Sequence, residues 1–269
     1  MQYIPIEKDY FSSCPFSAAL LTDFHNSDPD PVLDTLQKRR PDIITIAGDF
    51  IFGDRPKGKG LKIEENPRAV RLLQGCAGIA PTFVSLGNHE YMLTADDLQA
   101  VTAAGVHLLD NSWTVYEGIF IGGLNSAYVN VYRDFRRHSG SREVYPKPAS
   151  YVLRKKHVPK LDWLDEFENL EGYKLLLCHH PEYYPLYLRS RRIDLILSGH
   201  CHGGQWRFYS WLHKETRGIF APGQGLFPVL TSGIHDGKLV VSQGLSNTTW
   251  VPRINNPTEI VFLNPRIDP

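Results

Sequence analysis

Five short apolar segments alternate with polar clusters along the chain. Each is four to six residues long, is rich in aliphatic and β-branched side chains, and is bounded by glycine, proline or charged residues. Such segments are typical of buried strands. They cover residues 17–21, 42–47, 81–86, 174–177 and 194–197. The pattern therefore predicts five strands buried in the interior of the protein.

Amphipathic segments lie between these apolar runs. In residues 31–40, Val32, Leu33 and Leu36 share one face of a helix, and basic residues stand at its end, where the helix dipole favours them. A second helix begins after the N-cap Thr94. The predicted helices cover residues 31–40, 68–74, 94–101 and 161–167. Alternation of strands and helices indicates a layered α/β fold.

Two regions depart from this alternation and add strands. Residues 112–123 predict a β-hairpin that turns at Glu117-Gly118. Residues 237–244 and 259–263 predict further strands near the end of the chain. Two strand-rich halves indicate two stacked mixed β-sheets flanked by helices, in a single domain over residues 1–269. Residues 128–160 lie outside this pattern of strands and helices. Their long basic part would be either a solvated insertion or a lid over a substrate.

Composition narrows the class of protein. The 269 residues are 42% hydrophobic and 22% charged, which is ordinary for a soluble globular protein. A formal net charge of +0 provides no overall attraction for nucleic acid or an anionic membrane. The four cysteines are scattered without a CxxC pair, which argues against a disulfide framework. The N-terminus resembles no signal peptide and no segment is apolar enough to cross a bilayer, so we expect a cytoplasmic protein.

Metal-binding side chains follow each of the five predicted strands. In an α/β sheet, ligand sites gather at the carboxyl ends of the strands, so these side chains are expected to lie close together. The candidate ligands are Asp23, His25, Asp49, Asn88, His179, His200 and His202. Seven donors are too many for one ion that keeps an open position, and they suit two ions about 3.5–4 Å apart that share a carboxylate.

The order of these motifs resembles the calcineurin-like metallophosphoesterase superfamily. The motifs are DxH at 23–25, GD at 48–49, GNHE at 87–90, His179 and GHxH at 199–202. The last continues as GHCHGGQ through Gln205 and is similar to the GHTHGGQ of a bacterial branch. That branch includes phosphodiesterases and resembles enzymes that cleave the pyrophosphate of a diacylated UDP-sugar lipid precursor. The resemblance implies a four-layer fold of two stacked mixed sheets flanked by helices.

The same resemblance implies a role for each candidate. It assigns Asp23, His25 and His202 to a first metal ion. It assigns Asn88, His179 and His200 to a second. Asp49 would bridge the two ions, and His89 would lie beside them without binding either.

The chain differs from this branch at two points. Many members carry an N-terminal signal or membrane anchor, and none is visible here. Cys201 replaces the usual threonine between the two histidines. We expect the Cys201 side chain to point away from the ions, because neighbouring side chains alternate in direction within a tight turn.

This arrangement predicts a hydrolytic enzyme. A hydroxide bridging the two ions would attack phosphorus in line and hydrolyse a phosphodiester or pyrophosphate bond. His89 would act as the general acid, the alternative being a histidine that orients a ligand. A site rich in histidine suits Mn²⁺, Fe or Zn²⁺ better than Mg²⁺ or Ca²⁺, and we favour Mn²⁺.

The substrate expected is a small-molecule or lipid-linked phosphate ester. Nucleic acid is not expected as a substrate, because the sequence gives no sign of a basic groove interspersed with aromatic residues. No obligate protein partner is evident. A phosphomonoesterase, including a protein phosphatase, is an alternative within the same chemistry. A non-catalytic metal-bound scaffold on the same fold is an alternative of another class.

Two further features leave alternatives open. His180 would either face the substrate or cap the turn at Pro181. Aromatic and apolar residues in 206–211 and 225–227 would either form an apolar lip beside the site or pack in the ordinary way, and we favour packing.

Overall fold

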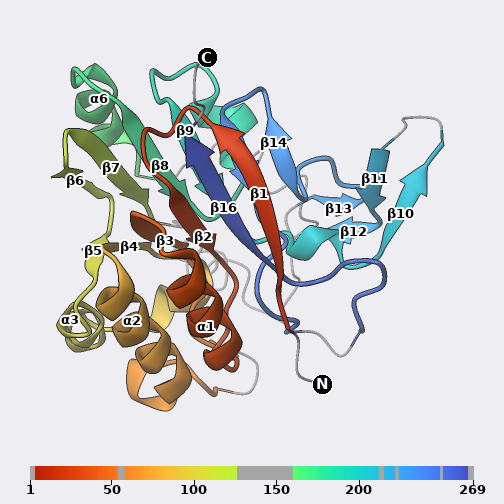
Figure 1. Ribbon diagram of the computed structural model, residues 1–269, viewed down its shortest axis with the longest axis horizontal. Coiled ribbons are helices and arrows are strands. Elements are labelled where there is room, and N and C mark those ends of the chain that lie inside the picture. The colour runs from red at the N-terminus through yellow and green to blue at the C-terminus, as the bar shows by residue number, and fades with distance from the viewer. Residues whose placement is uncertain are drawn as a thin grey trace, which may run out of the picture.

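Two stacked β-sheets form the centre of the protein in a computed structural model (Figure 1). The structure describes residues 4–53, 58–125, 160–211, 215–221, 224–248 and 251–265. Within these ranges, each of the two large sheets has six strands of mixed direction. The expected pair of stacked mixed sheets is confirmed.

The first sheet contains the three strands predicted in the N-terminal half. Its order is β1 (Ile6–Ser12), β16 (Glu259–Pro265), β2 (Ala18–Leu21), β3 (Ile43–Ala47), β4 (Thr82–Ser85) and β5 (His107–Leu109). Strands β2 to β5 run parallel, so their carboxyl ends lie along one edge of the sheet. Strand β16 lies between β1 and β2 and is antiparallel to β2.

The second sheet contains the two remaining predicted strands at its centre. Its order is β14 (Gly233–His235), β15 (Leu239–Val241), β9 (Leu195–Ser198), β8 (Lys174–Cys178), β7 (Ile119–Leu124) and β6 (Ser112–Tyr116). Strands β7, β8, β9 and β15 run parallel. The β6–β7 hairpin turns where the sequence predicts, with φ of 44° at Glu117 and 82° at Gly118.

Helices cover the outer faces of both sheets and complete four layers. Helices α1 (Asp30–Arg39), α2 (Pro67–Ile79) and α3 (Ala95–Ala103) pack on the first sheet. Helix α6 (Asp162–Asn169) and the π-helical turn η4 (Tyr184–Leu188) pack on the second. Three short 3₁₀ turns are η1 (Ile63–Glu65), η2 (His89–Met92) and η5 (His202–Gly204). Thr94 caps α3 as predicted, through a reciprocal capping box with Asp97.

The central strands are apolar on both faces because both faces are buried. In β2, Ala18 and Leu20 lie in the core between the sheets, whereas Ala19 and Leu21 lie in the core under the helices. This alternation follows from the two-residue period of a strand. Burial of both faces explains why the sequences of the predicted strands are continuous apolar runs.

Four short strands form a separate projection at the right of Figure 1. They are β10 (Arg207–Ser210), β11 (Glu215–Gly218), β12 (Phe220–Ala221) and β13 (Gly225–Leu226). Trp211 is 86% exposed, Leu226 68% and Phe227 67%. The expectation that these side chains pack in the ordinary way was therefore wrong.

Other expectations concern the chain outside the central sheets. The proposed insertion or lid at 128–160 lies outside the described residues apart from Lys160. Within the described ranges, none of the helices combines the length and the apolar character that crossing a membrane requires.

Candidate metal centre

The loops that follow five parallel strands bring the candidate ligands to one edge of the stacked sheets. Strands β2, β3 and β4 end in the loops that carry Asp23 with His25, Asp49, and Asn88. Strands β8 and β9 end in the loops that carry His179 and the His200–His202 pair. The two sheets thus contribute to one centre, as the strand-end argument predicts.

Asp49 lies among three imidazoles. Its Oδ2 is 3.0 Å from Nε2 of His179, 3.8 Å from Nε2 of His89 and 3.9 Å from Nε2 of His25. Its Oδ1 accepts a hydrogen bond of 2.9 Å from the backbone N–H of His89. The pKa of Asp49 is held well below its ordinary value: burial alone would raise it, but His179 and the other imidazoles favour the carboxylate more strongly. A carboxylate surrounded in this way can bridge two cations.

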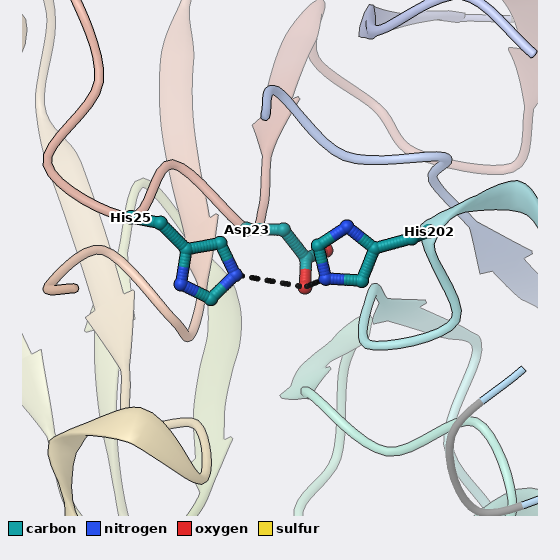
Figure 2. A group of neighbouring side chains, drawn as sticks. All are labelled: Asp23, His25 and His202. Carbon is teal, nitrogen blue, oxygen red and sulfur yellow. Dashed lines mark ion pairs between the residues drawn. The ribbon is translucent and has the colours of Figure 1, made fainter. Parts of the chain in front are cut away.

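Asp23 forms a second cluster with histidines from both sheets. Figure 2 shows the imidazoles of His25 and His202 on either side of the Asp23 carboxylate. Oδ1 of Asp23 is 3.3 Å from Nε2 of His202 and 3.9 Å from Nε2 of His25. It is also 3.8 Å from Nε2 of His179, which joins this cluster to the one around Asp49.

Four histidines of the centre share one orientation. Each directs Nδ1 to a backbone carbonyl and Nε2 towards Asp23, Asp49 or both. The Nδ1 contacts are His25 to Ile51 at 3.3 Å, His89 to Phe52 at 2.5 Å, His179 to Ala47 at 2.7 Å and His202 to Ser246 at 3.2 Å. A carbonyl can only accept, so each contact favours the tautomer with hydrogen on Nδ1. In a neutral ring the lone pair on Nε2 is then available for an ion. Burial lowers the pKa of His179, but the Asp49 and Asp23 carboxylates raise it to about 10, so His179 must release a proton to bind an ion.

The backbone at the centre adopts conformations that side chains usually avoid. Five of the candidate ligands have φ in the left-handed region: Asp23 (53°), His25 (49°), Asp49 (56°), His200 (68°) and His202 (46°). Such conformations cost on the order of 1 kcal/mol or more each and concentrate at functional sites. Gly87 allows a close approach here, because a Cβ at that position would lie 2.2 Å from Oδ1 of Asp49.

The donor set fits divalent cations. Nε2 of His25 and of His200 is buried and has no hydrogen-bond partner among the described residues. Burial, chiefly, lowers the pKa of His25, His200 and His202, so these imidazoles are neutral near pH 7. Buried neutral imidazoles facing carboxylates are costly unless an ion satisfies them. Among the residues that the structure describes, three groups are close enough to hold an ion: Asp23–His25–His202, His25–Asp49–His89 and Asp49–His179–His200.

His89 is more accessible than the other histidines of the centre. Its side chain is 25% exposed, whereas that of His25 is 1% and that of His179 is 0%. Asn88 precedes it, at the end of β4 and the start of η2. His89 thus faces both the Asp49 carboxylate and the solvent.

Glu90 joins two of the ligand loops, a role the sequence did not reveal. Its Oε2 accepts hydrogen bonds from the backbone N–H of Asp49 (2.8 Å) and of Gly87 (2.7 Å). Its Oε1 accepts a third from Ile51 at 3.1 Å. The side chain is 3% exposed, and burial raises its pKa to about 7. The only signal in the sequence was its place in the GNHE motif.

Replacing Glu90 with glutamine is expected to destabilise the metal-free protein by about 1–3 kcal/mol at pH 8. An amide presents one acceptor oxygen, so its NH₂ group must face a buried backbone N–H that the carboxylate now satisfies. Urea unfolding of the two proteins measures the difference. Glu64→Gln is the matched control, because Glu64 is an exposed side chain. A difference below about 0.5 kcal/mol would rule out this role.

Two buried side chains, those of His180 and Cys201, lie next to candidate ligands in the sequence. His180 is buried between His200, at a ring-centroid distance of 3.9 Å, and Tyr183, at 5.4 Å. It therefore packs against a candidate ligand in the interior of the protein. Sγ of Cys201 is 3.1 Å from Nε2 of Gln224 and 3.6 Å from Oε1 of Glu182. The Cys201 thiol belongs to none of the three metal-competent groups, in keeping with the expected orientation.

Comparison with known families gives one match over most of the chain. The profile described as calcineurin-like phosphoesterase matches residues 16–204. The matched region begins before β2 and includes every candidate ligand from Asp23 to His202.

Individual relatives are distant. An uncharacterized metallophosphoesterase of Helicobacter pylori strain J99 is 26% identical over 91% of this chain and 58% of its own length. An uncharacterized metallophosphoesterase of Bacillus subtilis, YkoQ, is 25% identical over 90% of this chain and 80% of its own length. Phosphodiesterase YaeI of Escherichia coli is 26% identical over 73% of this chain and 64% of its own length. The chain thus spans less than two thirds of the length of two of these three relatives.

Proposed function

Because this chain belongs to the calcineurin-like phosphoesterase family, we propose that it hydrolyses a phosphodiester or pyrophosphate bond with the help of two divalent metal ions. The observation that carries the proposal is the convergence of two carboxylates and four buried or nearly buried imidazoles from both sheets on one centre. The similarity to an E. coli protein named as a phosphodiesterase supports the choice of a diester.

The proposed ligands divide into two sets. The first ion would be held by Asp23, His25 and His202, the second by Asn88, His179 and His200, and both by Asp49. Two bound divalent cations supply Lewis acidity, neutralise the charge of a phosphate ester and lower the pKa of water. The histidine-rich set suits Mn²⁺, Fe or Zn²⁺, of which we favour Mn²⁺.

The ligand charges leave such a centre cationic. Asp23 and Asp49 contribute two negative charges, and the other five ligands are neutral. Two divalent ions therefore leave a formal charge of about +2, which attracts the oxygens of a phosphate ester. The contacts of Nδ1 with backbone carbonyls hold four imidazoles in place before a substrate arrives, so little reorganisation is needed during the reaction.

His89 is the proposed proton donor to the leaving group. The Phe52 carbonyl fixes its Nδ1, and its Nε2 lies 3.8 Å from Asp49 on the accessible side of the centre. To donate a proton, the imidazole would carry hydrogen on Nε2 as well as on Nδ1. Its greater exposure leaves room for the leaving oxygen.

The direct test is hydrolysis of two chromogenic esters, bis(p-nitrophenyl) phosphate and p-nitrophenyl phosphate, by Mn²⁺-loaded protein. We expect turnover of the diester, with kcat/KM above that of the monoester. Protein treated with a chelator is the control, and activity should return when Mn²⁺ is restored. Faster turnover of the monoester would indicate a phosphomonoesterase. Two bound ions without turnover of either ester or of a nucleoside diphosphate derivative would indicate a scaffold.

A further inference from the structure

A segment beyond the region matched by the family profile contacts both Asp23 and His202. This segment, Gln243–Ser246, follows β15, which runs parallel to β9 and next to it. It contains no side chain of the kinds that commonly bind metals. Its contacts are nevertheless concentrated on two proposed ligands of the first ion.

Three contacts hold the Asp23 loop. The backbone N–H of Leu245 donates to the Thr22 carbonyl at 3.0 Å. The Ser246 hydroxyl donates to the Asp23 carbonyl at 2.8 Å, in a buried position. Gly244 has φ of 78° and lies so close to Asp23 that a Cβ would stand 2.7 Å from Cβ of Asp23. The segment therefore fixes the backbone of Asp23, which is itself in the left-handed region.

The carbonyl of Ser246 also orients His202. Nδ1 of His202 lies 3.2 Å from this oxygen, and its Nε2 points to Asp23. The amide of Asn256 donates to the His202 carbonyl at 2.6 Å, so the backbone of His202 is held from the same part of the chain. One short segment thus sets the position of Asp23 and the ring orientation of His202.

Arg253 stabilises this segment. Its Nη2 donates to the carbonyls of Gln243 (2.8 Å) and Ser246 (2.5 Å) and lies 3.1 Å from Nδ1 of His202. Nδ1 is on the side of the ring opposite Nε2, so the guanidinium stands behind His202. Nη2 can only donate and the Nδ1–H of His202 is also a donor, so Arg253 acts on the ring through the Ser246 carbonyl, which both groups contact.

We propose that Arg253 and the Gln243–Ser246 segment are positioning elements for the first ion, selectively over the second. The inference rests on the ion assignments of the proposed function. It does not depend on turnover, because its prediction concerns metal binding. The contacts described above are to Asp23 and His202, and none of them is to His179 or His200 of the second set. Removal of a group that orients a metal ligand commonly lowers metal affinity by about 10–100-fold.

The test uses Mn²⁺ titrations of the metal-free full chain, with free Mn²⁺ followed by electron paramagnetic resonance. His200→Ala weakens the second site and reports on the first, and His202→Ala does the reverse. Adding Arg253→Met to His200→Ala is expected to weaken Mn²⁺ binding by about 10–100-fold. Adding it to His202→Ala is expected to change binding by less than about threefold, because Arg253 acts through His202. Equal weakening in both backgrounds, or in neither, would overturn the inference.

Further variants separate positioning from a general loss of folding. Arg253→Lys restores a donor and should recover part of the affinity lost in Arg253→Met. Ser246→Ala removes only the bond to the Asp23 carbonyl and should weaken the first site alone. Arg191→Met is the matched control, since Arg191 bonds Asp165 and Glu168 away from the centre. Wild-type protein that binds two ions but hydrolyses no ester would refute the proposed function and leave this test intact.

Discussion

Asp49→Asn is expected to reduce hydrolysis of a phosphodiester on the order of 10³-fold or more, together with the loss of at least one bound ion per chain. The substitution keeps the shape of the side chain and removes its charge. Oδ2 of Asp49 is the atom on which His25, His89 and His179 converge, so no other carboxylate can replace it between the two proposed ions. Steady-state kinetics combined with elemental analysis of the purified protein measures both effects.

The control for Asp49→Asn is Asp42→Asn. Asp42 immediately precedes β3, at the end of the strand opposite Asp49. Its carboxylate accepts hydrogen bonds from the backbone N–H and the hydroxyl of Ser17. That variant should keep both ions and most of its activity. Retention of two ions and activity within about tenfold of wild type in Asp49→Asn would contradict a bridging role.

His89→Ala is expected to keep both ions and to lower kcat by about 10²–10⁴-fold. A general acid matters most when the leaving group is basic. The loss should therefore be large for an alkyl phosphodiester and much smaller for a p-nitrophenyl ester, whose leaving group departs without a proton. The ratio of the two losses distinguishes proton donation from a general defect.

The structure also allows the opposite result, in which His89 binds an ion. His89 lies with His25 and Asp49 in a group that can hold an ion. If His89→Ala lost an ion, or if the two esters were affected equally, His89 would be a ligand or an orienting residue. His235→Ala is the matched control, because its Nε2 contacts the Ser232 carbonyl outside the centre.

The central layers could be predicted because strands that are buried on both faces have continuous runs of apolar residues. Runs such as 43–47 and 174–178 are mostly apolar and buried throughout, and each is followed within two residues by a candidate ligand. Strand β1 was missed because its residues, IEKDYFS, are largely exposed at a sheet edge and show no continuous apolar run. Helix α2 continues past the predicted end at Gln74 to Ile79, because packing on the first sheet overrides the low helix propensity of Gly75 and Gly78.

The same reasoning explains which residues of the candidate site could be predicted from the sequence. A ligand such as His200 is recognisable from its chemistry and its place after a strand. Glu90, Ser246 and Arg253 act through backbone atoms, and a backbone carbonyl or N–H carries no residue-type signal. The contact between Ser246 and Asp23 joins positions 223 residues apart, which no local pattern records.

The origin of the ligands in two different sheets has a consequence for the order of folding. Asp23 and His202 meet only after both sheets have formed and docked, so neither proposed ion can template an early step. We therefore expect metal binding to stabilise contacts that are absent from the transition state of folding. Such contacts slow unfolding and leave the folding rate nearly unchanged. The bound ions would therefore govern how long the folded protein persists, and the apolar cores would govern how quickly it forms.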